Sequence, residues 1–376
     1  MIESLESRIA PAAVLKFIDV DGDAVTVKTN KGTNDLLEAV CTLTPASPGS
    51  TRSHLDSIDF LASSEAASAF AGTDLSITVK QKAGGDGRVE VGGIVAQVAG
   101  NLLSMDLGKV SVNGNLGFIH AGDSDSATLA LRSLTADSLT EAATPSTIAG
   151  SVGKVKIRGD VLAVFSVGDG TIESVYVGGD LKGVEGIMQS GTIAALGIKK
   201  VFIGGNIEGA ATEGTGRLFA GEIDSLIIRG SVIGNGLSTG FVRVIHAQKI
   251  VIGGDIAGGG ASGSGTVLFI NCDLVEVGGN IIGGASDHTG RLSGTADEKP
   301  VIIRIKGDVV AGTGPNSGYV GVAGTIDSLT IKGDIDGKNQ NETLEAGLVT
   351  ADQIDQFKFG GRLIRGGRIL TTIPVA

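Results

Sequence analysis

Tryptophan is absent from this chain, and tyrosine and cysteine each occur only twice among its 376 residues. The two cysteines, Cys41 and Cys272, lie far apart and provide neither a disulfide framework nor a metal-ligand spacing. We expect Cys272 to lie in an inward-facing turn as a buried free thiol. The scarcity of tryptophan and tyrosine also leaves few of the aromatic platforms that sugar-binding solenoids present.

Charge and hydropathy disfavour two further kinds of partner. The net charge is −11 and no dense basic run occurs, so binding to nucleic acid or to an anionic membrane surface is not expected. No apolar run approaches membrane-spanning length, so membrane insertion is not expected either. Proline is scarce, at 7 residues, whereas glycine is abundant, at 61. This combination suits stacked strands, which cannot spare an N–H group, joined by glycine-rich turns.

One short signature recurs along most of the chain. In residues 201–207, Val-Phe-Ile-Gly-Gly-Asn-Ile, apolar residues alternate with others and a Gly-Asn pair follows. Counted by their marker glycines from Gly93 to Gly361, about twelve copies give a mean step of (361 − 93)/11, or about 24 residues, which is typical of a repeat architecture. The other copies occupy residues 89–95, 110–116, 155–161, 175–181, 226–232, 250–256, 275–281, 303–309, 329–335 and 357–363, with a degraded copy at 134–137.

Each copy predicts a short strand with one apolar face, because alternate residues of a strand point to the same side. Such a strand buries that face by stacking on the next copy, and the residues between copies suffice for the crossover that parallel neighbours need. Further short strands occur between copies, as in residues 221–226 and 266–270. The sequence therefore predicts an all-β fold, a parallel three-sided β-helix (β-solenoid) of about twelve coils in residues 87–376. We expect it to be right-handed, the usual hand of parallel crossovers.

The region before the stack is less regular. Residues 15–86 are expected to form a β-rich N-terminal cap region with a short helix at 63–70, whose N-cap is Ser63 or Ser64. Residues 1–14 are expected to form a targeting-like or assembly arm, and they lack the apolar segment of a Sec signal.

Residues 16–28 allow two interpretations. They fit two strands around a hairpin turn at Gly22, and they also fit a solenoid copy, because Gly93 follows Gly22 at close to three coil lengths. The turn carries three alternating acids, Asp19, Asp21 and Asp23. Such alternation occurs in calcium-binding loops, but the later bidentate acid of those loops is missing. Solvated acids in a hairpin turn are therefore the favoured interpretation, and calcium binding is the alternative.

The position after the marker glycine is mostly Asp or Asn, from Asn115 to Asp334. Carboxylates stacked at the spacing of neighbouring strands would repel one another if buried, and Asn and Ser interrupt the run. We therefore expect a partly solvated turn ladder that bonds backbone N–H groups. The four histidines fall at different phases of the coil, so no catalytic cluster is predicted.

Four consecutive copies place a large apolar residue at the outward position of the signature strand. These residues are Tyr176, Phe202, Ile227 and Val251. Contiguous apolar surface usually marks a contact, so we expect these side chains to be covered. The cover is either residues 1–86 of the same chain or the surface of another chain, and the sequence leaves both open.

The two ends of the sequence differ in charge. Arg362, Arg365 and Arg368 lie in a strand-prone C-terminal segment, whereas the N-terminal segment carries Glu3 and Glu6. We expect these groups to meet in a head-to-tail contact between copies, which does not close and therefore propagates a filament.

Residues 5–12, Leu-Glu-Ser-Arg-Ile-Ala-Pro-Ala, carry a resemblance to a known family. They resemble the LEPR-XLL type of N-terminal element of large bacterial β-strand-repeat proteins, with Ser7 in place of its Pro and Ala10 in its double-Leu end. The similarity continues in residues 17–27, 85–92 and 106–116. The resemblance implies export to the cell surface or exterior and a repeat-built body, and it implies no enzymatic activity.

The sequence thus predicts an extracellular or cell-surface structural protein, a rigid β-solenoid that assembles with itself into a homo-oligomer or filament. An adhesin-like module that binds a surface glycan or a protein is the alternative, and a carbohydrate-active β-helix enzyme is less favoured. No catalytic, cofactor or metal-ligating residue is predicted.

Overall fold

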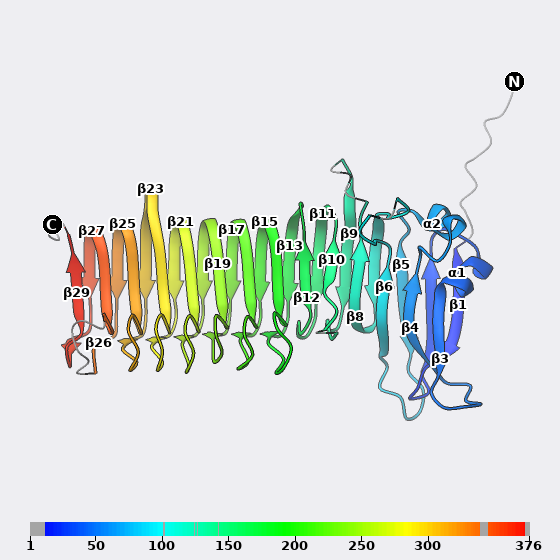
Figure 1. The fold of residues 1–376 in the computed structure, drawn as a ribbon, viewed down its shortest axis with the longest axis horizontal. Helices are drawn as coiled ribbons and strands as arrows, with labels where there is room; N and C mark the ends of the chain where they lie inside the picture. Colours follow the sequence, from blue (N-terminus) through cyan, green and yellow to red (C-terminus); the bar gives the residue numbers. More distant parts are fainter. Residues whose placement is uncertain are drawn as a thin grey trace, which may run out of the picture. The chain divides into compact units, whose positions relative to one another are not determined.

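The computed structural model describes residues 12–100, 102–123, 125, 127–141, 143–338 and 345–372. The chain is all-β, with 54% of its residues in strands and 4% in helices. Parallel stacked coils form a β-solenoid of about 11 turns, accompanied by an irregular N-terminal region (Figure 1). The predicted fold class is therefore confirmed, with about 11 turns against the expected twelve. Contacts divide the chain into a first unit, Met1–Glu141 with Ser146–Lys156, and a second unit, Ala142–Pro145 with Ile157–Ala376.

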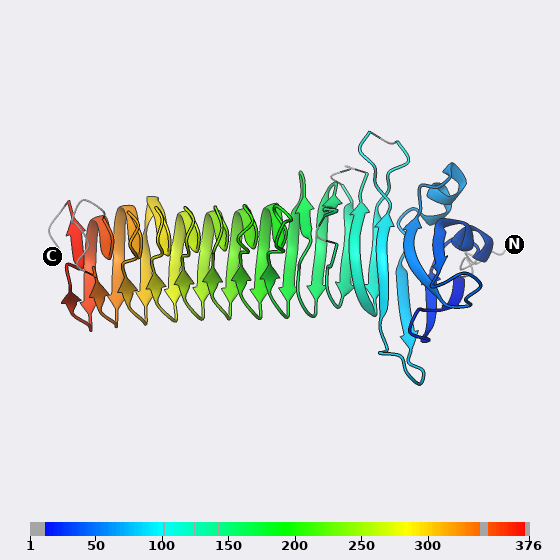
Figure 2. The same ribbon diagram turned by 60° about the horizontal axis from the view of Figure 1, so that its bottom comes forward.

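Long parallel strands dominate the described part of the second unit, each paired with the equivalent strand of the next coil (Figure 2). They are β15 (Thr192–Ile203), β17 (Arg217–Ile228), β19 (Phe241–Ile252), β21 (Thr266–Val277), β23 (Arg291–Ile305), β25 (Tyr319–Ile331) and β27 (Leu348–Phe359), followed by β29 (Arg368–Thr371). Two separate strands, β12 (Val164–Val167) and β13 (Thr171–Val177), pair with the first and second halves of β15. Each long strand therefore spans two sides of its coil.

Short strands supply the third side and pair in parallel among themselves. They are β14 (Leu181–Lys182), β16 (Ile207–Glu208), β18 (Val232–Ile233), β20 (Ile256–Ala257), β22 (Ile281–Ile282), β24 (Val309–Val310), β26 (Ile335–Asp336) and β28 (Leu363–Ile364). The predicted three-sided coil is thus present.

Inward columns of aliphatic side chains form the core of the second unit. In β15, Val201 and Ile203 are 2% and 0% exposed, and their equivalents in β17 are equally buried. Burying one such side chain contributes about 1.5–3 kcal/mol, and the columns repeat this in every coil. Cys272 is a free, fully buried thiol, as predicted, although it lies within β21 rather than in a turn.

The predicted polar turn ladder is confirmed from Asp160 to Asp334. Each ladder side chain accepts a hydrogen bond from the backbone N–H of the equivalent residue in the next coil, as Asp180 Oδ1 does from Asn206 at 2.5 Å. The glycine before each ladder residue leaves room for this bond, since a Cβ at Gly205 would overlap Asp180 Oδ1. The accepting side chains are those of Asp160, Asp180, Asn206, Ser231, Asp255, Asn280, Asp308 and Asp334, and Arg362 supplies the last backbone N–H.

A second polar column, which the sequence analysis missed, closes the turn before each long strand from β15 to β25. Its members are buried hydroxyl residues, Ser190, Thr215, Thr239, Ser264, Thr289 and Ser317, each 0% exposed. Thr215 Oγ1 accepts a hydrogen bond from Ala210 N at 2.9 Å and donates one to Thr212 O at 3.0 Å. The following Gly216 has a φ of 62°, a left-handed conformation that favours glycine. We call this column the hydroxyl column.

The first unit combines antiparallel and parallel pairing. Its strands are β1 (Ala13–Ile18), β2 (Ala24–Thr29), β3 (Cys41–Pro45), β4 (Ser53–Asp59), β5 (Leu75–Lys80), β6 (Val89–Val95), β7 (Leu107–Val112), β8 (Gly114–Ala121), β9 (Leu129–Ala136), β10 (Ser146–Ile148) and β11 (Ser151–Ile157). Strands β1 and β2 form an antiparallel hairpin, which confirms the hairpin interpretation of residues 16–28. The pairs β4–β6, β5–β7, β6–β8 and β7–β9 are parallel.

Two short helices accompany these strands. Helix α2 (Ser64–Phe70) has Ser63 as its N-cap, and the Ser63 hydroxyl accepts a hydrogen bond from Ala66 N at 3.1 Å, as the sequence predicted. Helix α1 (Asn34–Val40), capped by Thr33, was not predicted.

The predicted alignment of the copies at residues 89–95 and 110–116 is wrong. Val89 pairs with Gly114, whereas Val110 pairs with Leu75 and Leu134. These copies therefore lie on different sides of the coil rather than stacking on each other. The reason is that apolar alternation occurs on every side of a coil, so the pattern alone does not identify the side.

Candidate interaction surfaces

The four outward apolar residues of the second unit form one continuous column. Parallel pairing places Tyr176 beside Phe202, Phe202 beside Ile227 and Ile227 beside Val251. The rings of Tyr176 and Phe202 stack, with centroids 5.2 Å apart and planes inclined by 6°. The guanidinium of Arg229 lies over the Phe202 ring, 5.4 Å from its centroid. We call Tyr176, Phe202, Ile227 and Val251 the apolar stripe.

The apolar stripe faces outward without full cover. Tyr176 is 42% exposed, and the other three residues are partly exposed. Within the second unit, no described segment of the other coils fully buries them. Cover by residues 1–86 or by the surface of another chain stays a prediction.

The C-terminal arginines are engaged within their own chain. Arg362 forms an ion pair with Asp334, with Nη2 and Oδ2 3.2 Å apart, and this guanidinium holds the pKa of Asp334 below its usual value. Arg365 forms an ion pair with Asp336, while Arg368 lies in β29 opposite Leu348. Their predicted partners, Glu3 and Glu6, lie outside the described residues. The head-to-tail contact therefore stays a prediction, although two of its arginines already have partners.

The three acids of the β1–β2 turn lie together. Ligand atoms of Asp19, Asp21 and Asp23 are all within 4.8 Å of one another. The expected solvated acids are not found, because Asp19 and Asp23 are only 5% and 0% exposed. Asp23 accepts hydrogen bonds from Lys82 N and Gly87 N, both at 2.6 Å, and so ties the hairpin to the loop before β6.

Protonation of Asp19 reduces the charge repulsion between these closely spaced carboxyl groups. Burial, together with a hydrogen bond between the two carboxyl groups, raises the pKa of Asp19 to about 6, and the same hydrogen bond lowers the pKa of Asp21. The backbone N–H groups of Gly22 and Asp23 also point at Asp19 Oδ1. These donors occupy positions that a calcium ion would need, so the geometry favours a structural turn over a calcium loop.

The second unit has a second outward surface that was not predicted from the sequence. It consists of the outward side chains in the first halves of β15 to β25, that is in residues 192–196, 217–221, 241–245, 266–270, 291–295 and 319–323. These segments contain three arginines and no acidic residue, in a chain whose net charge is −11. Three of their outward side chains are aromatic, Phe219, Phe241 and Tyr319. We call this surface the arginine face.

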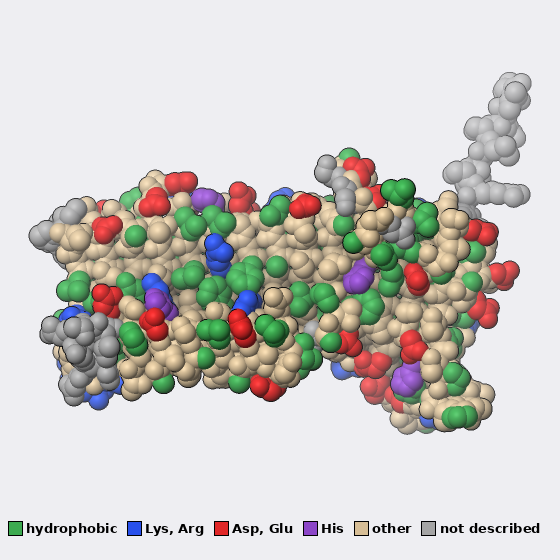
Figure 3. Space-filling view, viewed as in Figure 1, with side chains coloured by type: hydrophobic (Ala, Val, Ile, Leu, Met, Phe, Trp, Pro, Cys, Tyr) green, Lys and Arg blue, Asp and Glu red, His purple; other side chains and the backbone are tan. Residues whose placement is uncertain are grey.

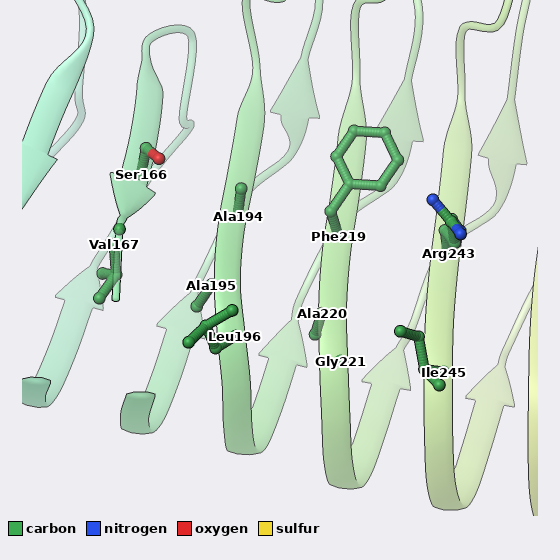
Figure 4. Close-up of a pocket in the computed structure, with 11 residues that line it drawn as sticks. Ser166, Val167, Ala194, Ala195, Leu196, Phe219, Ala220, Gly221, Arg243 and Ile245 are labelled. Carbon is green, nitrogen blue, oxygen red and sulfur yellow. The ribbon is translucent and has the colours of Figure 1, made fainter. Parts of the chain in front are cut away.

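A shallow hollow of about 340 Å³ lies on the arginine face. Phe219 and Arg243 pair in register across neighbouring strands and project from the same face, above Leu196 and Ile245 (Figure 4). Leu196 is 59% exposed and Ile245 is 36% exposed. In the space-filling view, hydrophobic and basic side chains likewise lie next to one another over the coils (Figure 3).

A polar hollow of about 180 Å³ lies across the bend of the same strands. Strand pairing aligns Glu222, His246 and Asn271 on three successive coils. The coil phases of the four histidines did not predict this alignment, because two of the three residues are not histidines. Beside them, residues 297–300 form an exposed insertion in β23, and Lys299 forms an ion pair with Asp273. The sequence signal for this insertion is the interval between the marker glycines Gly279 and Gly307, which is longer than the mean coil.

No protein-family model, no curated protein and no solved structure matches this chain. Among the described residues, neither helix is long and apolar enough to cross a membrane. The functional argument therefore depends on the surfaces themselves.

Proposed function

We propose that this protein is an extracellular or cell-surface structural protein whose rigid β-solenoid assembles side by side with further copies through the apolar stripe. The observation that carries the proposal is the continuity of the stripe. Four outward apolar residues stand in register on successive coils, and one of their rings stays 42% exposed. Contiguous apolar patches of this kind usually mark protein contacts.

The backbone supports a structural role. From Asp180 to Asp334 the polar ladder joins each coil to the next in addition to the sheet, and the hydroxyl column closes a turn within each coil. Such repetition gives a stiff scaffold, because each coil contacts only its neighbours through the same set of bonds. The extracellular placement draws its support from the resemblance of residues 5–12 and from the repeat-built body, and the non-catalytic role is part of the same proposal.

The test is the association state of Phe202→Asp, measured by sedimentation velocity over a range of protein concentrations. Phe202 is partly exposed, so aspartate is expected to leave the fold intact while placing a charge in the contact. We expect the wild-type protein to form larger species and the variant to sediment as a monomer.

The matched control is Thr330→Asp. Thr330 occupies the same outward column outside the apolar stripe, between Arg304 and Lys358. The Thr330→Asp variant should associate like the wild type. Persistent assembly of Phe202→Asp, or a wild-type protein that is monomeric at every concentration, would overturn the proposal. Protease accessibility on intact cells checks the location.

A further inference from the structure

The charge of the arginine face is opposite to that of the chain. With three of the 30 basic residues on this face and none of the 41 acids, the rest of the chain carries 27 − 41, a net charge of −14. Two arginines of the face have acidic neighbours at the adjoining turns, because Arg217 interacts with Glu213 and Arg291 with Asp287. The face is thus a basic strip within an acidic chain, and the charges of these two arginines are partly compensated by their neighbours.

Arg243 is the arginine without such a neighbour. Its side chain is exposed, and no described residue forms a hydrogen bond or an ion pair with it. It stands at the edge of the shallow hollow beside Phe219 and Ile245 (Figure 4). A guanidinium offers a planar pair of N–H donors that matches a carboxylate. The hollow therefore combines an anion donor with an apolar floor.

The rings of the face are held in place by its other arginines. The Arg217 guanidinium lies 5.6 Å from the centroid of Phe219, and that of Arg291 lies 4.9 Å from the centroid of Tyr319. Arg217 Nε also donates to Ser238 O at 2.9 Å. Phe219 and Phe241 contact each other with centroids 5.9 Å apart. These contacts fix the rings before a ligand arrives, so little entropy is lost on binding.

From this arrangement we infer that the arginine face binds a linear acidic polysaccharide, one whose sugars carry carboxylates. The apolar side of a sugar ring packs on Phe219, Leu196 and Ile245, and its carboxylate pairs with Arg243. Neighbouring strands lie about 4.8 Å apart, so a linear chain that crosses successive coils passes Arg217 in β17, Arg243 in β19 and Arg291 in β23.

The structure disfavours other polymers. An extended peptide commonly binds by adding a strand, but here the backbone groups of β15 to β21 are already paired between coils. A nucleic acid, with its dense charge, is opposed by the acidic remainder of the chain. The inference goes beyond the proposed structural role, since it concerns a different surface and a different partner.

The test is isothermal titration of the full-length protein with a hyaluronan oligosaccharide, in which every second sugar carries a carboxylate. We expect binding by the wild type and a loss of affinity of about tenfold or more in Arg243→Gln. Phe219→Ser should weaken binding to a similar degree. A neutral N-acetylglucosamine oligomer of equal length should bind at least about tenfold more weakly.

Two controls separate this site from general charge attraction. Arg229→Gln removes an equally exposed arginine that lies over Phe202 on the neighbouring side, and it should bind like the wild type. Poly-L-glutamate should not compete with the oligosaccharide. Equal affinity of the Arg243→Gln variant, no wild-type binding of hyaluronan, or full competition by poly-L-glutamate would each overturn the inference.

The outcome is independent of the assembly proposal. Phe202→Asp should keep the oligosaccharide affinity of the wild type even as it loses association, and Arg243→Gln should keep association. Circular dichroism of Arg243→Gln and Phe219→Ser should match the wild type, and Arg243→Lys, which keeps the charge without the planar donor pair, provides a second variant if Phe219→Ser unfolds.

Discussion

The two units both contain parallel strand pairs, which the first unit combines with antiparallel pairs, but they secure their turns differently. In the second unit the same two polar devices, the ladder and the hydroxyl column, recur coil after coil. In the first unit each turn has its own solution, such as buried Asp23, which joins the β1–β2 hairpin to a distant loop, or the Ser63 cap of α2. Repetition spreads the stability of the second unit over many equivalent positions, whereas the first unit depends on individual residues. The four changes below probe this difference, from the largest expected effect to the smallest.

Gly205→Ala should have the largest effect. The added Cβ would overlap Asp180 Oδ1 and crowd the backbone of Gly179, so it forces the ladder apart between two coils. We expect the free energy of unfolding of the second unit to fall by about 2–4 kcal/mol, measured by chemical denaturation. Gly260→Ala is the matched control, because nothing lies within 4 Å of a Cβ there. Equal stability of the two variants would contradict the steric role of the ladder glycine.

Thr215→Val should lower the free energy of unfolding by somewhat less than Gly205→Ala does. Valine keeps the shape of the side chain but leaves Ala210 N and Thr212 O without their buried hydrogen-bond partner. We expect a loss of about 1–3 kcal/mol and faster amide exchange in this turn, followed by hydrogen exchange with mass spectrometry. Thr313→Val, at an exposed turn position, should change stability by less than about 0.5 kcal/mol. A loss confined to Thr215→Val would establish the hydroxyl column as a stabilising device.

The acids of the first unit should make its stability depend on pH. The pKa of Asp19 is raised from 3.8 to about 6, so the folded state holds this proton more tightly than the unfolded state does. The resulting stabilisation is fully present below pH 3.8 and is lost as the pH rises through about 6. Because the pKa of Asp21 is lowered at the same time, we expect a net loss of about 1–2 kcal/mol from about pH 4 to about pH 7.

Denaturation of Asp19→Asn over this pH range tests the assignment. Asparagine keeps a neutral side chain at every pH, so this part of the pH dependence should disappear. Glu38→Gln, at an exposed position of α1, should retain it. An unchanged pH profile in Asp19→Asn would assign the titration to another group.

Ser63→Ala should have the smallest effect, about 1 kcal/mol, because it removes the one side-chain cap at the start of α2. Ser68→Ala, on the exposed side of the same helix, should be neutral or slightly stabilising. Hydrogen exchange of the α2 amides measures both. Equal exchange rates of the α2 amides in the two variants would show that the Ser63 cap does not stabilise the helix.

The sequence was most informative where chemistry repeats. The alignment of Tyr176 with Phe202, Ile227 and Val251 followed from the marker glycines alone, and so did the ladder of Asp and Asn side chains. Both depend on a fixed offset from a Gly that sterics impose. The helix at Ser64–Phe70 was predictable because its cap signal is local.

Other features could not be predicted because they depend on neighbours from other coils. The hydroxyl column precedes Gly216 and its equivalents, yet Ser and Thr are common throughout the chain and give no signal until burial is known. The arginine face was missed because Arg217 and Arg243 occupy different columns, and only the pairing of β17 with β19 brings Phe219 beside Arg243. The burial of Asp23 similarly depends on the loop at Lys82–Gly87, far away in sequence.

The ladder also divides a mechanical load into equal steps. Every rung has its acceptor on one coil and its donor on the following coil, as from Asn206 to Ser231. Peeling away either coil breaks the same hydrogen bond and leaves both of its groups to water. Stretching should therefore open the coils of the second unit one rung at a time and at similar forces, from whichever side the load is applied. Single-molecule stretching would record these openings as a series of similar steps.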